Sequence, residues 1–165
     1  AMQNRVLNLS ILVPAKTELV IPVACVEAGR WARQRSDFDV SEDIAFSELR
    51  QKKVAAVSRS MRSVGDRRAD QSEVWSRIDK MRKDFRVDTP TGAMSDIFES
   101  RRDQVEGYVK GVPEQQGQLG AVFVINGKIA GLDLFEHPEI FAGISAKLVR
   151  SYAMDAIRQP ANLRS

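Results

Sequence analysis

The stretch VACVEAGRW at residues 23–31 holds the residue types best suited to chemistry. An apolar run ends at Glu27, and a glycine, a guanidinium and an indole follow within four residues. Arg30 can hold a phosphate or carboxylate through its planar fork, and Trp31 can stack on a base or a sugar. Glu27 can accept a ribose hydroxyl or act as a base. The alternative is structural: an Arg–Glu ion pair fixes a loop, and the indole covers the edge of the core.

Gln71 and Trp75 form a second candidate site at the start of an expected helix. They are four residues apart and therefore share a helix face. The positive end of that helix favours an anion, so both are candidate ligand-binding residues. The competing interpretation is a capped helix whose tryptophan belongs to the core.

Asp133 is an acid within an apolar strand. A buried carboxylate is costly unless it is paired, and Arg30 and Arg150 are candidate partners. Burial would also suit Asp133 to donating a proton, so it joins Glu27 as a candidate catalytic residue. Arg150 is in addition a candidate ligand-binding residue, and the alternative is a pair within its own helix.

Several kinds of site are absent from the sequence. There is one histidine, His137, and one cysteine, Cys25, which excludes an internal disulfide and argues against a typical metal site. No Walker loop, GxGxxG, HExxH or GxSxG pattern occurs. The basic run at 59–68 has few aromatic side chains for stacking, which argues against nucleic acid. Whether the chain is an enzyme, and which cofactor it would use, stays open.

Length and composition fit one domain spanning residues 1–165, with 43% hydrophobic and 28% charged residues. No apolar run approaches the roughly 20 residues of a membrane helix. With a single cysteine, a reducing cytoplasm is the simplest compartment. Residues 50–110 hold 15 of the 25 Lys and Arg and 10 of the 22 Asp and Glu, a balance of +5 that favours an anionic partner.

A first hairpin is expected to position the VACVEAGRW stretch. The segment RVLNLSILV at 5–13 alternates, with its leucines, Ile11 and Val13 on one face, which predicts a half-buried strand. The apolar run at 19–26 returns beside it and ends at Glu27. If an edge of this hairpin is uncovered, it will recruit a second chain, so we expect a homodimer joined through the hairpin or the apolar surface beside it.

A second hairpin is the clearest local signal. The apolar runs 121–125 and 129–135 flank Asn126 and Gly127, which tolerate the positive φ of a type I′ turn. Both strands are apolar at nearly every position, so we expect the hairpin to be covered on both faces.

Helical periodicity predicts the remaining elements. Helices are expected over 44–64, after a capping box begun by Asp70, from Ser95 to about Val109, and from Pro138 to about Arg158. The first of these should end at Gly65, and its expected apolar face consists of Leu49, Val54, Val57, Met61 and Val64. The expected apolar face of the second consists of Val74, Ile78, Met81 and Phe85. The expected fold is α+β: an antiparallel sheet built from two β-hairpins, at about 5–27 and 120–135, with about four helices packed on it.

Five phrases carry a family resemblance, namely QNRVLNLSILVPA, IPVACVEAGRW, DQSEVW, NGKIAGLDLF and KLVRSYAMDA. Together they resemble the domain family named for its association with ADP-ribosylglycohydrolases and rhodanese-phosphatases, from Gln3 to about Ile157. Members usually carry a further β-rich segment before the QNR phrase, which this chain is expected to lack, either as a short form or because that region was removed. The resemblance implies a domain of unknown function, linked by association to ADP-ribose or NAD-derived nucleotides.

Two hypotheses of function follow. In the first, the chain binds a small anionic ligand of the nucleotide or ADP-ribose type around Glu27, Arg30 and Trp31. In the second, it is a non-catalytic protein-interaction module in which the same residues are structural.

Overall fold

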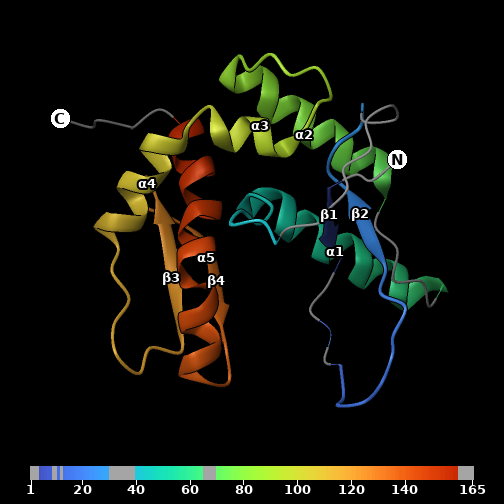
Figure 1. Ribbon diagram of the computed structural model, residues 1–165, viewed down its shortest axis with the longest axis vertical. Helices are drawn as coiled ribbons and strands as arrows, with labels where there is room; N and C mark the ends of the chain where they lie inside the picture. The colour runs from blue at the N-terminus through green and yellow to red at the C-terminus, as the bar shows by residue number, and fades with distance from the viewer. Residues whose placement is uncertain (1–3, 9–10, 12, 30–39, 65–69, 160–165) are drawn as a thin grey trace. The chain divides into compact units, whose positions relative to one another are not determined.

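The computed structural model describes residues 4–8, 11, 13–29, 40–64 and 70–159 of the chain (Figure 1). In this part the α+β class is confirmed, with five helices and two antiparallel hairpins. The elements in chain order are β1 (Arg5–Leu7), β2 (Val23–Cys25), α1 (Ser47–Val64), α2 (Gln71–Phe85), α3 (Met94–Glu99), α4 (Arg102–Gly111), β3 (Gly120–Ile125), β4 (Lys128–Leu134) and α5 (Pro138–Arg158). The two hairpins form separate two-stranded sheets and not one sheet as expected.

The chain divides into two compact units. Unit 1 comprises residues 1–39 and 49–96, and unit 2 comprises residues 40–48 and 97–165. Unit 1 therefore holds the first hairpin and α2, whereas unit 2 holds α4, the second hairpin and α5. Helices α1 and α3 cross the boundary. That residues 1–165 form a single domain stays a prediction.

The first hairpin is shorter than its alternating sequence suggests. Arg5 lies opposite Cys25 in the antiparallel register, and each strand has three residues. The predicted burial is wrong at Leu7 and Val13, which are 53% and 47% exposed, while Asn8 between them is only 2% exposed. Because the alternation continues past the short paired segment, it does not mark which side chains face the core.

Helix α2 forms as its sequence predicts. The Asp70 carboxylate accepts hydrogen bonds from the backbone N–H groups of Ser72 and Glu73, at 2.9 and 3.3 Å, which satisfies donors that the first turn leaves unpaired. The predicted apolar face is buried, and it consists of Val74, Ile78, Met81 and Phe85.

Helix α1 buries a different face from the one expected. Leu49 and Val57 are buried as predicted, but Val54 is 51% exposed. The buried face has a strict four-residue spacing that brings in Lys53, which is 6% exposed. The predicted stop at Gly65 lies outside the described residues.

The expected helix from Ser95 to Val109 is two helices. Helix α3 ends at Glu99 and α4 begins at Arg102, and Ser95 lies inside α3 and does not cap it. At the break, the Ser100 hydroxyl donates to the Ile97 carbonyl at 2.7 Å. Such a side chain competes with the helical hydrogen-bond pattern, which explains the interruption.

The second hairpin confirms the predicted turn. Asn126 and Gly127 have φ angles of 52° and 75°, as a type I′ turn requires. The hairpin lies against α5 (Figure 1). On its inner face the Phe123 ring stacks on Tyr152, with ring centroids 3.8 Å apart. The expectation of cover on both faces is wrong, because the outward-facing Val122 and Val124 are 57% and 58% exposed.

Helix α5 begins at Pro138, as predicted, where a missing backbone N–H costs no helical hydrogen bond. Its second half is the most deeply buried helical segment of unit 2, from Leu148 to Asp155. None of the described helices combines the length and the apolar composition that a membrane crossing requires.

Candidate functional site

Glu27 belongs to unit 1 and has no exposed surface. One carboxylate oxygen accepts the backbone N–H of Asn4 at 3.3 Å, and the other accepts the Thr91 hydroxyl at 3.1 Å. The backbone of Glu27 also forms an antiparallel bridge with Ala93. A buried carboxylate needs such partners, and here they come from two separate chain segments. Glu27 therefore joins the first hairpin to the segment that precedes α3.

The glycine of the VEAGRW phrase has a steric role. The Gly29 N–H donates to the Thr91 carbonyl at 2.7 Å. A Cβ at this position would lie 2.9 Å from both the Cα and the carbonyl oxygen of Thr91, which is too close for any other residue without a backbone shift. Arg30 and Trp31, the next two residues, lie outside the described residues.

Gln71 links helix α2 to strand β2. Its side-chain oxygen accepts the Cys25 N–H and its nitrogen donates to the Cys25 carbonyl, both at 2.8 Å. The amide thus takes the place of a neighbouring strand along the edge of β2 that faces away from β1. This contact brings two predicted site residues, Gln71 and Glu27, to one end of the same strand.

Trp75 lies one turn after Gln71 on the same face of α2. Its indole nitrogen is buried and finds no hydrogen-bond acceptor among the described residues. A buried donor without an acceptor costs about 1–3 kcal/mol, so it is a natural contact for a ligand oxygen.

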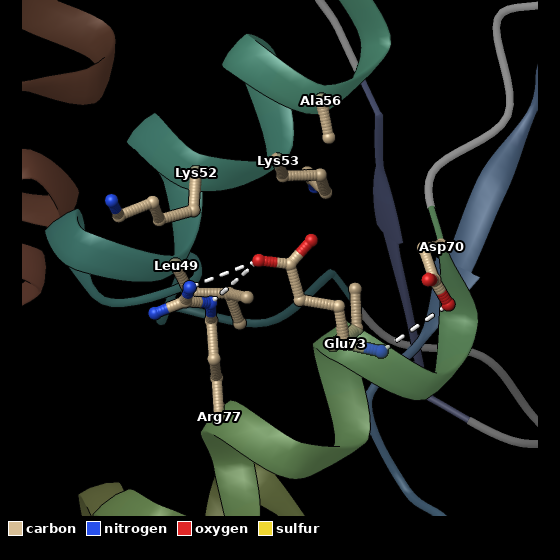
Figure 2. Close-up of a pocket in the computed structure, with 8 residues that line it drawn as sticks. Leu49, Lys52, Lys53, Ala56, Asp70, Glu73 and Arg77 are labelled. Carbon is tan, nitrogen blue, oxygen red and sulfur yellow. Dashed lines mark hydrogen bonds and ion pairs between the residues drawn. The ribbon is translucent and has the colours of Figure 1, made fainter. Parts of the chain in front are cut away.

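A small cavity lies between α1 and α2, beside the start of α2 (Figure 2). Its volume is about 10 Å³, close to the space of one water molecule. The Lys53 amine is held by the Leu7 carbonyl, and burial together with the charge of Arg50 lowers the pKa of Lys53 to about 8. The lining residues are Leu49, Lys52, Lys53, Ala56, Asp70, Glu73, Val74 and Arg77.

Sequence reasoning missed Lys53. The available signal was its position four residues from both Leu49 and Val57, on the apolar face of α1. Across the cavity, Glu73 binds Arg77 at 2.9 Å, which places a compensated ion pair beside the lysine (Figure 2). The cavity is lined by both signs of charge and is too small for a nucleotide.

Asp133 belongs to unit 2, where it has a partner that the sequence did not predict. Its carboxylate accepts the Tyr152 hydroxyl at 2.8 Å. The same tyrosine ring stacks on Phe123, so the acid and the ring together fix the inner face of the hairpin against α5. The predicted partner Arg30 lies outside the described residues, and Arg150 binds other carboxylates.

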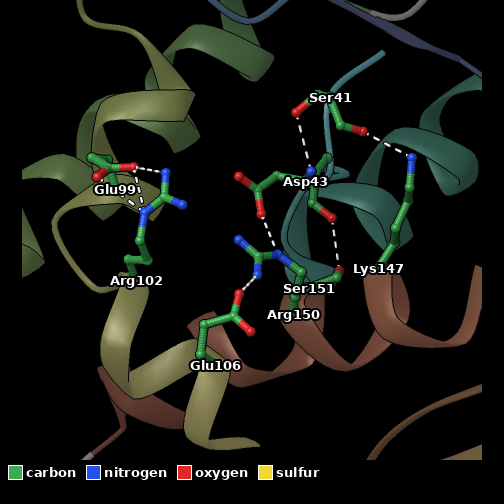
Figure 3. Close-up of polar contacts among 9 residues, drawn as sticks. Ser41, Asp43, Glu99, Arg102, Glu106, Lys147, Arg150 and Ser151 are labelled. Atoms are coloured by element: carbon green, nitrogen blue, oxygen red, sulfur yellow. Dashed lines mark hydrogen bonds and ion pairs between the residues drawn. The ribbon is translucent and has the colours of Figure 1, made fainter. Parts of the chain in front are cut away.

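Arg150 lies at the centre of an ion-pair network in unit 2 (Figure 3). Its guanidinium donates to Asp43 at 2.7 Å and to Glu106, and its side chain is 8% exposed. Burial acts to lower the pKa of Arg150, but the hydrogen bonds and charges of Asp43 and Glu106 outweigh it and hold the pKa above its ordinary value. The network ties the segment before α1 to α4 and α5, in place of the pairing within one helix that was the alternative.

Asp155 forms a further buried polar contact in unit 2. Its carboxylate accepts the Ser47 hydroxyl and the Glu48 N–H, the latter at 2.9 Å, and so caps the start of α1. Burial raises the pKa of Asp155, and the hydrogen bond from Ser47 opposes that rise. The residue was not among the predicted sites, since a carboxylate that caps a distant helix leaves no local pattern.

Two groups of predicted residues emerge. Glu27, Gln71 and Trp75 are in unit 1, whereas Asp133 and Arg150 are in unit 2. Among the residues described, no group of three or more His, Cys, Asp and Glu side chains is placed to hold a metal ion. The hydrogen bonds described for the two candidate catalytic acids, Glu27 and Asp133, join structural elements within their own units.

Comparison with known proteins adds one finding. Searches of curated proteins and of solved structures found no match. One family model, however, matches residues 1–164, which is essentially the whole chain. That family is a domain of unknown function associated with ARG and rhodanese-phosphatase proteins, and the earlier resemblance is thereby confirmed. The chain belongs to the family of the ARG and Rhodanese-Phosphatase-superfamily-associated Protein domain.

Proposed function

We propose that the chain binds a small ligand rich in anionic oxygens, of the nucleotide or ADP-ribose type, at the end of β2 in unit 1. The residues that would serve it are Trp75 and, next along the chain from Gly29, Arg30 and Trp31. Glu27 and Gln71 hold the strand end in place. Glu27 and Asp133 remain candidate catalytic residues, with no reaction assigned.

The observation that carries the proposal is the indole N–H of Trp75. It is a buried donor without an acceptor among the described residues, and a phosphate or carboxylate oxygen is the acceptor that satisfies such a donor best. Protein atoms cover the N–H, so a ligand reaches it only with a local shift of its neighbours.

The charge and family of the chain give further support. Residues 50–110 have an excess of five positive charges, from 15 Lys and Arg against 10 Asp and Glu, which favours anions. The association of the family with ARG proteins fits a ligand related to ADP-ribose. This second argument rests on association and supplies no mechanism.

A thermal-shift screen with ADP-ribose, NAD and related nucleotides tests the proposal. A specific ligand at 100 times its dissociation constant is expected to add about 2.7 kcal/mol to the free energy of unfolding. Trp75→Phe keeps an aromatic ring and removes the donor, together with part of the indole. It should weaken binding about tenfold or more, since a hydrogen bond to a charged group contributes roughly 1.5–3 kcal/mol.

Arg30→Ala is the companion variant, expected to abolish binding while the protein stays folded by circular dichroism. Unfolding of Arg30→Ala would mean that the arginine is structural. If Trp75→Phe destabilises the free protein but leaves affinity unchanged, the indole N–H has a structural partner and the assignment fails. A lack of response to every anionic metabolite would favour the protein-interaction module.

A further inference from the structure

Lys53 is a buried amine that the proposed ligand site at Trp75 does not use. Its side chain lies on the buried face of α1 and is 6% exposed, and its amine donates to the Leu7 carbonyl. Among the described residues the amine has no carboxylate partner. A buried ammonium without a counter-charge is costly, so this position favours the neutral amine.

The surroundings keep a large share of this amine neutral near pH 8. Burial and the charge of Arg50 lower the pKa of Lys53 to about 8, so roughly half of the amine is neutral at that pH. An ordinary lysine, with a pKa of 10.5, is neutral in fewer than about 1% of molecules under the same conditions. A neutral amine is a nucleophile, whereas an ammonium has no lone pair to share.

The space beside Lys53 limits which electrophile reaches it. Lys53 lines the cavity between α1 and α2, whose volume of about 10 Å³ is close to the space of one water molecule (Figure 2). Sugars, acyl thioesters and other large electrophiles are too big for that space. Carbon dioxide is small, linear and uncharged, so it enters a protein interior without the desolvation cost that an anion meets.

The charges around the cavity favour an anionic group on Lys53. Besides Lys53, the lining side chains carry two positive and two negative charges, namely those of Lys52, Arg77, Asp70 and Glu73. Arg50 acts on the amine as a third positive charge. A protonated Lys53 therefore leaves this group with a net charge of +2, whereas an anion on the same nitrogen leaves it neutral.

We propose that Lys53 binds carbon dioxide reversibly, as a carbamate, in the cavity between α1 and α2. The lone pair of Nζ forms a bond to the carbon of carbon dioxide, one C=O π bond becomes a C–O⁻ group, and the nitrogen gives one proton to solvent. The carbamate nitrogen keeps one N–H for the Leu7 carbonyl. The modification thus preserves the contact between α1 and the first hairpin while it reverses the charge of the side chain. It is independent of the ligand proposed at Trp75.

Chemical trapping of the carbamate tests this proposal on the whole chain. The protein is equilibrated with isotopically labelled bicarbonate at about pH 8, where half of the Lys53 amine is neutral, and is then treated with a trialkyloxonium salt, which converts a carbamate into a stable ester. Peptide fragmentation in a mass spectrometer locates the label. It should be at least about tenfold more abundant on Lys53 than on Lys52, the exposed neighbour, because the neutral fraction of a buried lysine is larger. In concentrated urea the two lysines should be labelled alike.

Stability gives a second readout, with a matched pair of variants. At constant pH and ionic strength, carbon dioxide should raise the urea midpoint of the wild type, because the carbamate forms preferentially in the folded chain. Lys53→Met should abolish this rise. Lys80→Met, which removes a 66% exposed lysine of α2, should leave it unchanged. If Lys53→Met fails to fold, the comparison of folded and urea-unfolded wild type still decides. No label on Lys53, equal label on both lysines of the folded chain, or the same rise in Lys53→Met would overturn the proposal.

Discussion

The two hairpins of this protein are held in opposite ways. Side chains brace the first, because Glu27, Gln71 and Lys53 each bind its backbone or the segment beside it. Ring stacking and a long register hold the second, which has six and seven residues in its strands against three in each strand of the first. The short hairpin depends on distant polar groups, whereas the long one is specified by its own turn and pairing.

The first hairpin is suited to positioning the residues that follow it, whereas the second presents an exposed surface. The polar braces hold the end of β2, after which the sequence places an arginine and a tryptophan. The second hairpin needs no such braces and leaves an apolar face exposed. Variants that remove one of these side-chain contacts at a time therefore test whether the stability of the first hairpin depends on them more than that of the second.

The largest effect is expected at Glu27. Glu27→Ala leaves the Asn4 N–H and the Thr91 hydroxyl without their acceptor, at roughly 1–3 kcal/mol each, so the free energy of unfolding should fall by about 4 kcal/mol. The matched variant in the second hairpin is Asp133→Ala, which loses the contact with Tyr152 and should cost about 1 kcal/mol. Urea denaturation measures both. Equal losses would contradict the contrast between the hairpins.

The next effect concerns Lys53 and depends on pH. Its pKa is about 8 in the folded chain and 10.5 ordinarily, so between these values the unfolded chain binds more protons. The free energy of unfolding should therefore rise with pH from about 8 to about 10.5. At 1.36 kcal/mol per pKa unit, the difference of about 2.5 units gives at most about 3 kcal/mol.

Lys53→Met is the control for this rise, since it keeps the length of the side chain and removes the amine. Subtracting its stability from that of the wild type at each pH isolates the lysine from the other groups that titrate in alkali. A parallel pH dependence of the two proteins would show that burial of Lys53 carries no such cost.

The smallest expected loss of stability comes from replacing two glutamines, each of which binds the backbone of a strand. Gln71→Ala removes two hydrogen bonds to Cys25 and should cost about 2 kcal/mol. Gln118→Ala removes one bond to the second hairpin, at the Gly120 carbonyl, together with an exposed bond from the Gln115 N–H, and should cost about 0.5 kcal/mol. Hydrogen exchange at the Cys25 amide should accelerate in Gln71→Ala alone. Unchanged exchange there would mean that the amide is protected by something other than Gln71.

Several features were predictable from the sequence because their causes lie within a few residues. Asn126 and Gly127 adopt the positive φ that their types allow, and Asp70 caps α2 through neighbouring N–H groups. Pro138 begins α5 for an equally local reason. Glu27 was also recognised as the acid at the end of a strand, although its partners, Asn4 and Thr91, could not be inferred.

Tertiary structure alone decided which surfaces are buried and which charges meet. Lys53 is buried and Val54 exposed on one helix, and Val122 is exposed in a strand that is apolar throughout. Asp133 accepts the hydroxyl of Tyr152, a contact between a strand and a helix that no local pattern predicts. A local pattern states what a segment prefers, but the burial of a face depends on what packs against it, and that partner comes from residues far away in the chain.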